Sequence, residues 1–355
     1  MKRLPIAILA CWLTLTANAV AQVSLAPPPG APTPLVTSTP AAKPKPKAPA
    51  IRKPTAAAAP KPAATPEATV TPAPVPDDPN VDLVYGAYQR GMYKTAFDLA
   101  TQRAKEKGDP KAMTMLGELY SNAMGVRLDY GKAIEWYQRA SDAGDREAMF
   151  ALAMLRLSGR GGPVDHEKAV KLLASSAKLG NPKAAYNLAL LYLDGQTLPQ
   201  DVNRAAELLR VAADAGNPEA QYALATFYKE GTGVEKNPEK SVRLLQAASL
   251  ADNVDAEVEY AIALYNGTGT PKNEAAAVAL LRKAAKQNSP IAQNRLATVL
   301  VSRPDVADKI EGLKWHLVAK TAGKGDPMLD AALQDLAPED RAKAQAGARK
   351  WLGTK

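Results

Sequence analysis

Residues 218–253 read PEAQYALATFYKEGTGVEKNPEKSVRLLQAASLADN, and the same pattern of small, aliphatic and aromatic residues occupies the 36 positions before them, residues 182–217. One position of every copy is alanine. These alanines are Ala112, Ala148, Ala184, Ala220, Ala256 and Ala292. A fixed period of this length is the sequence signature of a repeat protein, in which each copy is one small unit stacked on its neighbours.

Each copy predicts two helices. A residue that can cap a helix N-terminus precedes the first helix, and proline follows it in four copies. The first capping series is Asp109, Asp145, Asn181, Asn217, Asn253 and Ser289, and the second is Asp129, Asp165, Asp201, Asn237 and Asn273. Glycines at 159, 195, 231 and 267 suit the left-handed residue that ends a helix. Since one copy cannot bury its apolar face alone, neighbouring copies are expected to share a continuous core.

The two ends of the array depart from the pattern. Residues 81–108 predict a shortened helix pair hinged at Gly91, and in the last copy Asp308 is predicted to cap the second helix. Residues 326–352 predict one or two closing helices, with Pro338 at a helix start. The predicted fold is therefore all-α: a right-handed α-solenoid of about seven antiparallel helix pairs with a C-terminal helical cap, over residues 81–355.

The first 21 residues predict a secretory signal. Met1-Lys2-Arg3 is followed by an apolar stretch to Leu15 and by the small residues that precede a cleavage near Ala21. The one cysteine, Cys11, lies inside this segment, so the mature chain is expected to have no disulfide and no cysteine metal site. The expected location is outside the cytoplasm, in the periplasm, with no transmembrane segment in the mature chain.

Residues 22–80 predict a disordered arm rich in proline, alanine and lysine. They hold 17 of the 29 prolines and no aromatic residue, so they cannot bury enough apolar surface to offset chain entropy. They also hold six basic and three acidic residues. The arm is either a solvated spacer or a basic segment that contacts acidic surfaces such as cell wall or anionic lipid head groups.

The net charge of +9 overstates how basic the folded part is. Lys2 and Arg3 contribute +2 and the arm contributes +3, which leaves +4 for residues 81–355. That charge is ordinary for a domain of this size. Nucleic acid is therefore not expected among the partners.

The repeat pattern resembles the Sel1-like repeat family, which is related to tetratricopeptide repeats. The residues that carry the resemblance in the first full copy are Ala112, Leu116, Gly117, Tyr120, Gly125, Val126, Asp129, Lys132, Ala133, Trp136, Ala140 and Gly144. It covers residues 109–323 closely and 81–108 loosely, with departures at Arg156, where tyrosine is usual, and Asp252, where glycine is usual. The resemblance implies an adaptor or scaffold, and secreted bacterial members include periplasmic partners of membrane sensor kinases and envelope-assembly proteins.

Residues capable of catalysis are few. His166 is expected to be exposed in the first turn of a second helix, and His316 to pack in the core. Ser175-Ser176-Ala177-Lys178 matches the Ser-x-x-Lys box of serine β-lactamases, but no Ser-Asp-Asn or Lys-Thr-Gly companion exists. The chain is therefore expected not to be an enzyme and to need no cofactor or metal, with a β-lactamase-like hydrolase as the least favoured alternative.

The expected function is that of a non-catalytic periplasmic scaffold or regulator that binds another protein, membrane-bound or periplasmic, in a concave groove. In tetratricopeptide solenoids the first helix of each pair lines that groove, and aromatic side chains with a polar rim make good anchors. The candidate residues are Phe150, Tyr186, Asn187, Leu190, Asp194, Tyr222, Glu230 and Tyr265. Core packing between repeats is the alternative role for these residues. The alternative function is a cell-wall-associated protein that binds peptidoglycan or its enzymes.

Overall fold

A computed structural model describes residues 82–353, which form sixteen helices, α2–α17, and no strand. The predicted signal and the whole of the predicted arm lie outside these residues. The first helices of the full repeats are α4 (Pro110–Ser121), α6 (Arg146–Ser158), α8 (Pro182–Asp194), α10 (Pro218–Glu230), α12 (Val254–Asn266) and α14 (Pro290–Val301). The second helices are α5 (Tyr130–Asp142), α7 (His166–Lys178), α9 (Val202–Asp214), α11 (Pro238–Leu250), α13 (Glu274–Lys286) and α15 (Val306–Thr321).

The ends are built as the sequence predicts. Helices α2 (Leu83–Gln89) and α3 (Tyr93–Lys107) form the shortened pair, and Gly91 between them has a φ of 73°. Helices α16 (Pro327–Asp335) and α17 (Pro338–Leu352) follow the last repeat, with Pro338 in the first turn of α17. The predicted α-solenoid of seven pairs with a helical cap is confirmed.

The helix boundaries follow from the capping residues. Asn217 Oδ1 accepts the backbone N–H of Ala220 at 2.7 Å, and Gly231 ends the same helix with a φ of 80°. Both capping series act in this way throughout the full repeats. One prediction is wrong: Asp305, not Asp308, caps α15, because Asp305 Oδ1 accepts the backbone N–H of Asp308 at 3.0 Å. Asp308 lies inside the first turn and pairs with Arg303 instead.

The core depends on small residues that let helices approach closely. The alanines of the 36-residue series are all buried, as are the leucines four positions after five of them; the half-buried Tyr260 takes that place after Ala256. At Gly117 the helices are so close that a Cβ would lie 2.6 Å from the ring of Tyr137. This close packing fixes each first helix against its own second helix and against the repeat before it.

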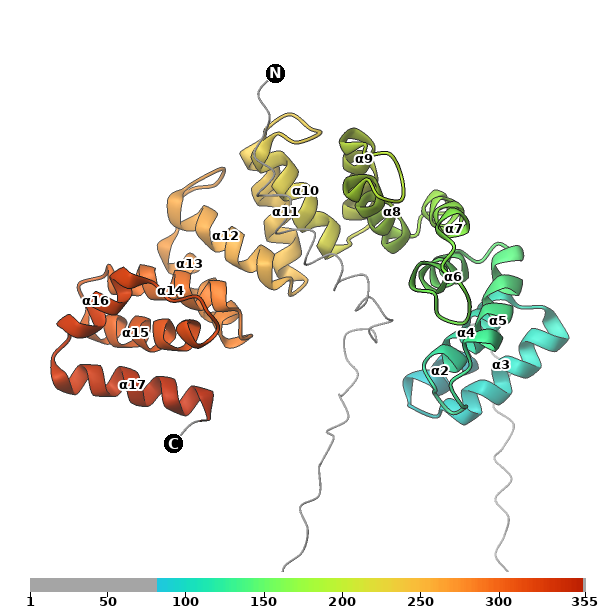
Figure 1. Cartoon of the computed structure of the whole chain (residues 1–355), viewed down its shortest axis with the longest axis horizontal. Helices are drawn as coiled ribbons and strands as arrows, with labels where there is room; N and C mark the ends of the chain where they lie inside the picture. Colours follow the sequence, from blue (N-terminus) through green and yellow to red (C-terminus); the bar gives the residue numbers. More distant parts are fainter. Residues whose placement is uncertain (1–81, 354–355) are drawn as a thin grey trace, which may run out of the picture.

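Figure 1 shows that the helix pairs stack one after another into an arch, with α2 and α3 at one foot and α17 at the other. On the N-terminal side, α4, α6 and α8 lie toward the inside of the arch, whereas α5, α7 and α9 lie toward the outside. At the other foot the rings of Trp315 and Trp351 are 4.9 Å apart and join α15 to α17. The arch thus presents one inner surface made mainly of first helices.

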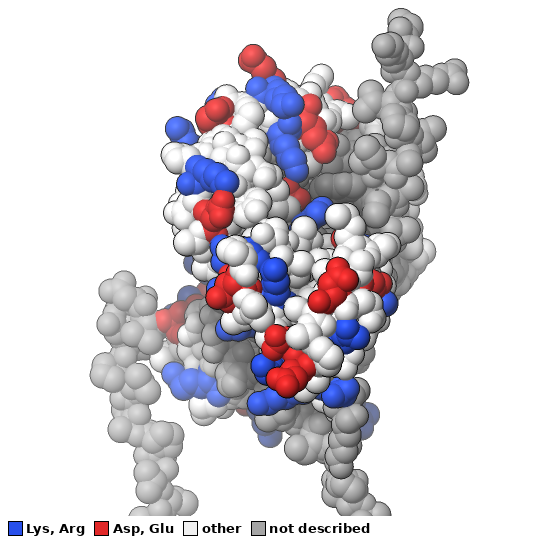
Figure 2. All heavy atoms as spheres, turned by 90° about the vertical axis from the view of Figure 1, so that its left-hand side faces the viewer, with Lys and Arg blue, Asp and Glu red and all other residues white. Residues whose placement is uncertain are grey.

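The surface of the C-terminal foot carries charges of both signs. Figure 2 shows Lys and Arg interspersed with Asp and Glu over this side, with no extended area of one sign. Within residues 82–353, no group of His, Cys, Asp or Glu side chains is arranged to hold a metal ion. None of the helices in that range is both long and apolar enough to cross a membrane.

Candidate functional site

Two tyrosines and four carboxylates gather on three successive first helices. Tyr186 lies on α8; Glu219, Tyr222 and Glu230 lie on α10; Asp255 and Glu259 lie on α12. We call this set the acidic tyrosine face. Tyr186 and Tyr222 occupy the same repeat position and are both half-buried, so their ring edges reach the surface while their bodies pack on the core.

The tyrosines and the carboxylates of this face interact electrostatically. Burial raises the pKa of Tyr186 to about 12, and the negative charge of Glu219 on the next repeat adds to the shift. Burial also raises the pKa of Tyr222 to about 12, with contributions from Asp255, Glu259 and Glu230 in that order. Both phenols therefore keep their proton at neutral pH and can donate hydrogen bonds.

The carboxylates of the acidic tyrosine face are only partly neutralised. Lys229 Nζ lies 2.7 Å from Glu259 Oε2, which links α10 to α12. No ion pair among residues 82–353 involves Glu219, Glu230 or Asp255. Loss of hydration, and then the charge of Glu259, raise the pKa of the Asp255 carboxyl above its usual value. A cation brought to this face would therefore meet carboxylates that have no cation of their own.

The structure corrects the expected exposure of two candidate residues. Phe150 and Asn187 are each only 6% exposed, so neither can anchor a partner from an open groove. Phe150 packs in the core shared with α8 and α10, and the side-chain amide of Asn187 donates to the backbone oxygen of Lys183 at 2.8 Å. Phe150 therefore serves the packing between repeats, which was the alternative role.

The other predicted binding residues either belong to the acidic tyrosine face or lie on the same helices outside it. Leu190 and Asp194 are half-buried on α8, one and two turns after Tyr186. Tyr265 packs beside the C-terminal core, and Lys272 Nζ lies 5.6 Å from the centre of its ring. Of the predicted residues, Tyr186, Tyr222 and Glu230 belong to the acidic tyrosine face.

Three members of the face were missed by the sequence analysis: Glu219, Asp255 and Glu259. Each contributes to the pKa of a tyrosine in the preceding repeat. The pattern within one repeat does not show them, because the contacts cross from one repeat to the next. The signal that could have found Glu219 and Asp255 is an acidic residue 33 positions after each tyrosine.

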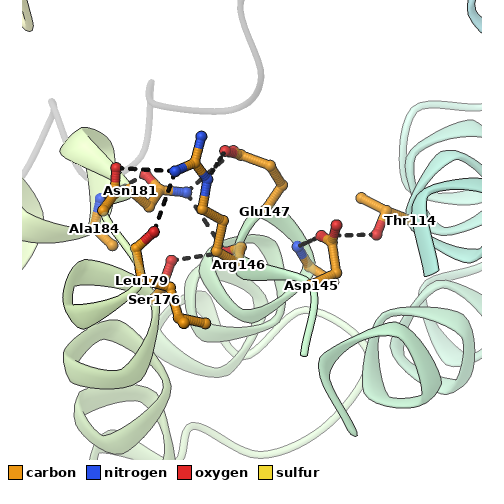
Figure 3. Close-up of polar contacts among 10 residues, drawn as sticks. Thr114, Asp145, Arg146, Glu147, Ser176, Leu179, Asn181 and Ala184 are labelled. Carbon is orange, nitrogen blue, oxygen red and sulfur yellow. Dashed lines mark hydrogen bonds and ion pairs between the residues drawn. The ribbon is translucent and has the colours of Figure 1, made fainter. Parts of the chain in front are cut away.

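Figure 3 shows a second polar cluster, around the start of α6 and the end of α7, that includes one serine of the Ser-x-x-Lys box. Ser176 is fully buried and its hydroxyl donates to the backbone oxygen of Arg146 at 2.6 Å. This hydrogen bond therefore links α7 to α6. Ser175 and Lys178 are exposed on the surface of α7.

The two histidines take the places predicted for them. His166 is exposed at the start of α7. His316 is fully buried on α15, with Nε2 2.9 Å from Asp330 Oδ1 on α16. Lys320 Nζ also contacts Asp330 Oδ1, at 2.7 Å. His316 and Lys320, both on α15, therefore hold α16 through the same carboxylate.

Comparison with known proteins agrees with the repeat geometry. Five consecutive segments match the Sel1 repeat and together make up half of the chain: residues 110–145, 146–181, 182–217, 218–253 and 254–289. The chain belongs to the Sel1 repeat family. Sel1-repeat solenoids generally act as non-catalytic scaffolds for protein–protein interaction. No curated protein matches this Sel1-repeat chain.

The solved structures that resemble it include two repeat proteins. One is a protective antigen of uropathogenic Escherichia coli with an SLR fold: TM-score 0.65, 26% identity, 76% of this chain and 59% of the antigen covered. The Sel1-repeat chain thus spans less than two thirds of the antigen's length. The other is a Sel1 repeat protein from Oxalobacter formigenes, with a TM-score of 0.53, 23% identity, and 61% of this chain and 86% of that protein covered.

Proposed function

We propose that this Sel1-repeat chain is a periplasmic scaffold or regulator that binds a segment of another protein on the acidic tyrosine face. The observation that carries the proposal is the cluster itself. Two half-buried tyrosines lie on successive repeats, beside three carboxylates outside the ion pairs of the described residues. Rigid aromatic rings with a polar rim are good anchors for a partner, because they lose little entropy on binding.

The chemistry of the face favours a basic partner segment. Tyr186 and Tyr222 offer ring edges and hydroxyl donors, whereas Glu219, Glu230 and Asp255 offer only acceptors at neutral pH. Lysine and arginine side chains satisfy such carboxylates, and arginine can also stack on a tyrosine ring. Complementary charge mainly raises the rate of association and selects among partners.

The periplasmic location rests on the N-terminal sequence, which has a basic start, a short apolar run and a small-residue cleavage site. A protein in that compartment can meet the outer domains of membrane proteins as well as soluble ones. Cell fractionation with an antibody against the repeats tests the location. Recovery with the cytoplasmic proteins, at the unprocessed size, would contradict export.

Site-specific photocrosslinking in intact cells tests the binding surface. A photoreactive residue replaces Thr226, which lies on α10 one turn from both Tyr222 and Glu230 and is half-buried. The control position is Arg243, exposed on α11, a second helix. We expect one discrete protein to be captured from Thr226 and not from Arg243, and to be lost in Asp255→Asn/Glu259→Gln. Identical products from both positions, or cell-wall fragments alone, would overturn the proposal.

A further inference from the structure

Residues 43–54 of the arm read KPKPKAPAIRKP, with five cations, four prolines and no acidic residue. We propose that this segment docks on the acidic tyrosine face of its own chain and competes there with the partner protein. The inference rests on the proposed function, because it concerns the same face. It adds that the face is occupied before a partner arrives.

Charge complementarity is the first argument. Glu219, Glu230 and Asp255 take part in no ion pair within residues 82–353, and of the four carboxylates of the face only Glu259 is paired, with Lys229. Lys43 and Arg52 each lie three residues from Pro46 or Pro49, so in a polyproline II helix, which has three residues per turn, both cations share one face with these prolines. A single exposed ion pair stabilises little, but a row of them holds a flexible segment and is sensitive to salt.

The prolines give a second, independent match. Proline-rich segments adopt the polyproline II helix in advance and dock on surfaces lined by aromatic rings. Three residues of that helix advance ~9 Å. Packed helix axes lie ~8–10 Å apart, and α8 and α10, the first helices of successive repeats, both pack on α9. Pro46 and Pro49 are three residues apart, so one proline can meet Tyr186 while the other meets Tyr222 on the next repeat.

The chain between the segment and the solenoid is long enough. Residues 55–81 span up to ~80 Å if they extend as polyproline II at ~3.1 Å per residue. Helix α10 lies four helix pairs after α2 along the arch. At ~10 Å a step this is a path of about 40 Å. Since the segment is tethered within reach, its docking is an intramolecular event with a high effective concentration.

The test is to map crosslinks within the purified full-length chain, with the photoreactive residue again at position 226. We expect mass spectrometry to find products that join α10 to residues 43–54. Their yield should fall about tenfold in Lys43→Gln/Lys45→Gln/Lys47→Gln/Arg52→Gln/Lys53→Gln, which corresponds to about 1.4 kcal/mol, and should fall likewise in 0.5 M salt. The matched control, Glu67→Gln/Asp77→Asn/Asp78→Asn, changes the same arm and should keep the full yield.

Several outcomes would overturn the inference. These are the absence of arm crosslinks at position 226, crosslinks that survive neutralisation of the segment, and equal crosslinks from the Arg243 position. A mixture of heavy-isotope and normal protein separates docking within one chain from docking between copies; products that join heavy to light chains would contradict same-chain docking.

The in-cell experiment keeps the two proposals distinguishable. Partner capture from Thr226 without arm crosslinks means that only the inference fails. Suppose that the wild-type chain gives arm crosslinks, but that neither the wild type nor the neutralised arm variant captures a partner. The proposed function then fails, whereas the inference holds. If both hold, neutralising residues 43–53 should raise the yield of partner capture, because the competing segment has been removed.

Discussion

Repeats 146–181 and 254–289 differ at one corner, where the start of the first helix lies beside the end of the second helix. Both corners hold a cation, but it is on the first helix in one repeat and on the second helix in the other. In repeat 146–181 the cation is on the first helix. Arg146 Nη1 donates to the backbone oxygens of Leu179 and Gly180 at 3.1 and 3.3 Å, where α7 ends (Figure 3). The positive group thus meets the negative end of a helix.

In repeat 254–289 the cation is on the second helix. Lys283 Nζ lies 2.6 Å from Asp252 Oδ1 and 2.6 Å from Glu257 Oε1. Glu257 is on α12 and is fully buried, and its other oxygen accepts from Gln287 Nε2 at 3.0 Å. Asp252 takes the left-handed conformation, with a φ of 59°, at the position where three other repeats have glycine.

The difference shows that two repeats join the same corner with different chemistry. The Arg146 corner uses helix carbonyls that water could also satisfy. The Lys283 corner buries a carboxylate, which is costly unless a cation and a donor hold it. The two corners should therefore respond very differently to loss of their cation.

Lys283→Met should have the largest effect. The substitution keeps an apolar stem but leaves the Glu257 carboxylate buried with only Gln287, so we expect α12 and α13 to lose about 3 kcal/mol of local stability. Hydrogen exchange measures this directly, as faster exchange confined to these helices and their neighbours. The control is Lys286→Met on the exposed side of α13, with an expected change within about 0.5 kcal/mol. Equal effects of the two variants would refute the role given to the buried pair.

Arg146→Met should cost less, about 1 kcal/mol. The carbonyls at the end of α7 lose a charged donor but remain near solvent, where water replaces it. Urea unfolding and exchange at α7 check the value. Lys178→Met serves as a control on the exposed surface of α7. A loss as large as that of Lys283→Met would mean that the two corners do not differ in the way described.

The sequence predicts most of this fold because one pattern, repeated every 36 residues, fixes caps, core and glycine stops together. It fails where one copy departs from the pattern. The repeat alignment with Asp129 and its counterparts predicts Asp308 as the cap of α15, but that helix begins earlier, at Val306, and Asp305 caps it.

The candidate site was harder to predict. Tyr186 and Tyr222 could be found as aromatic residues at one repeat position. Their burial, and that of Phe150 and Asn187, depends on how far each helix turns against the next one. Three of the four carboxylates that face the tyrosines, Glu219, Asp255 and Glu259, come from the following repeat, so a single repeat read alone cannot bring them together.

Ser176→Ala should cost at most about 1 kcal/mol, the value of one hydrogen bond. Alanine fills this position in other repeats, at 140, 212, 248 and 284, so the packing accepts it. The Oγ–Arg146 hydrogen bond at 2.6 Å would be lost. Thermal unfolding compared with Ser175→Ala, an exposed neighbour, isolates the buried contribution. If Ser175→Ala were the more destabilising of the two, the Ser176 hydrogen bond would not be what stabilises the contact between α7 and α6.

Asp252→Gly should give the smallest change, and in the opposite direction. Glycine adopts a positive φ without the steric cost that a side chain brings, which is about 1 kcal/mol or less for aspartate. The variant also loses the contact with Lys283, but Asp252 is 75% exposed, so that pair contributes little. We expect a gain of about 0.5 kcal/mol in local stability where α11 meets α12, seen as slower exchange in these two helices. Since Lys283 keeps its contact with Glu257, a loss of stability would instead show that Asp252 is needed to hold the lysine over the buried carboxylate.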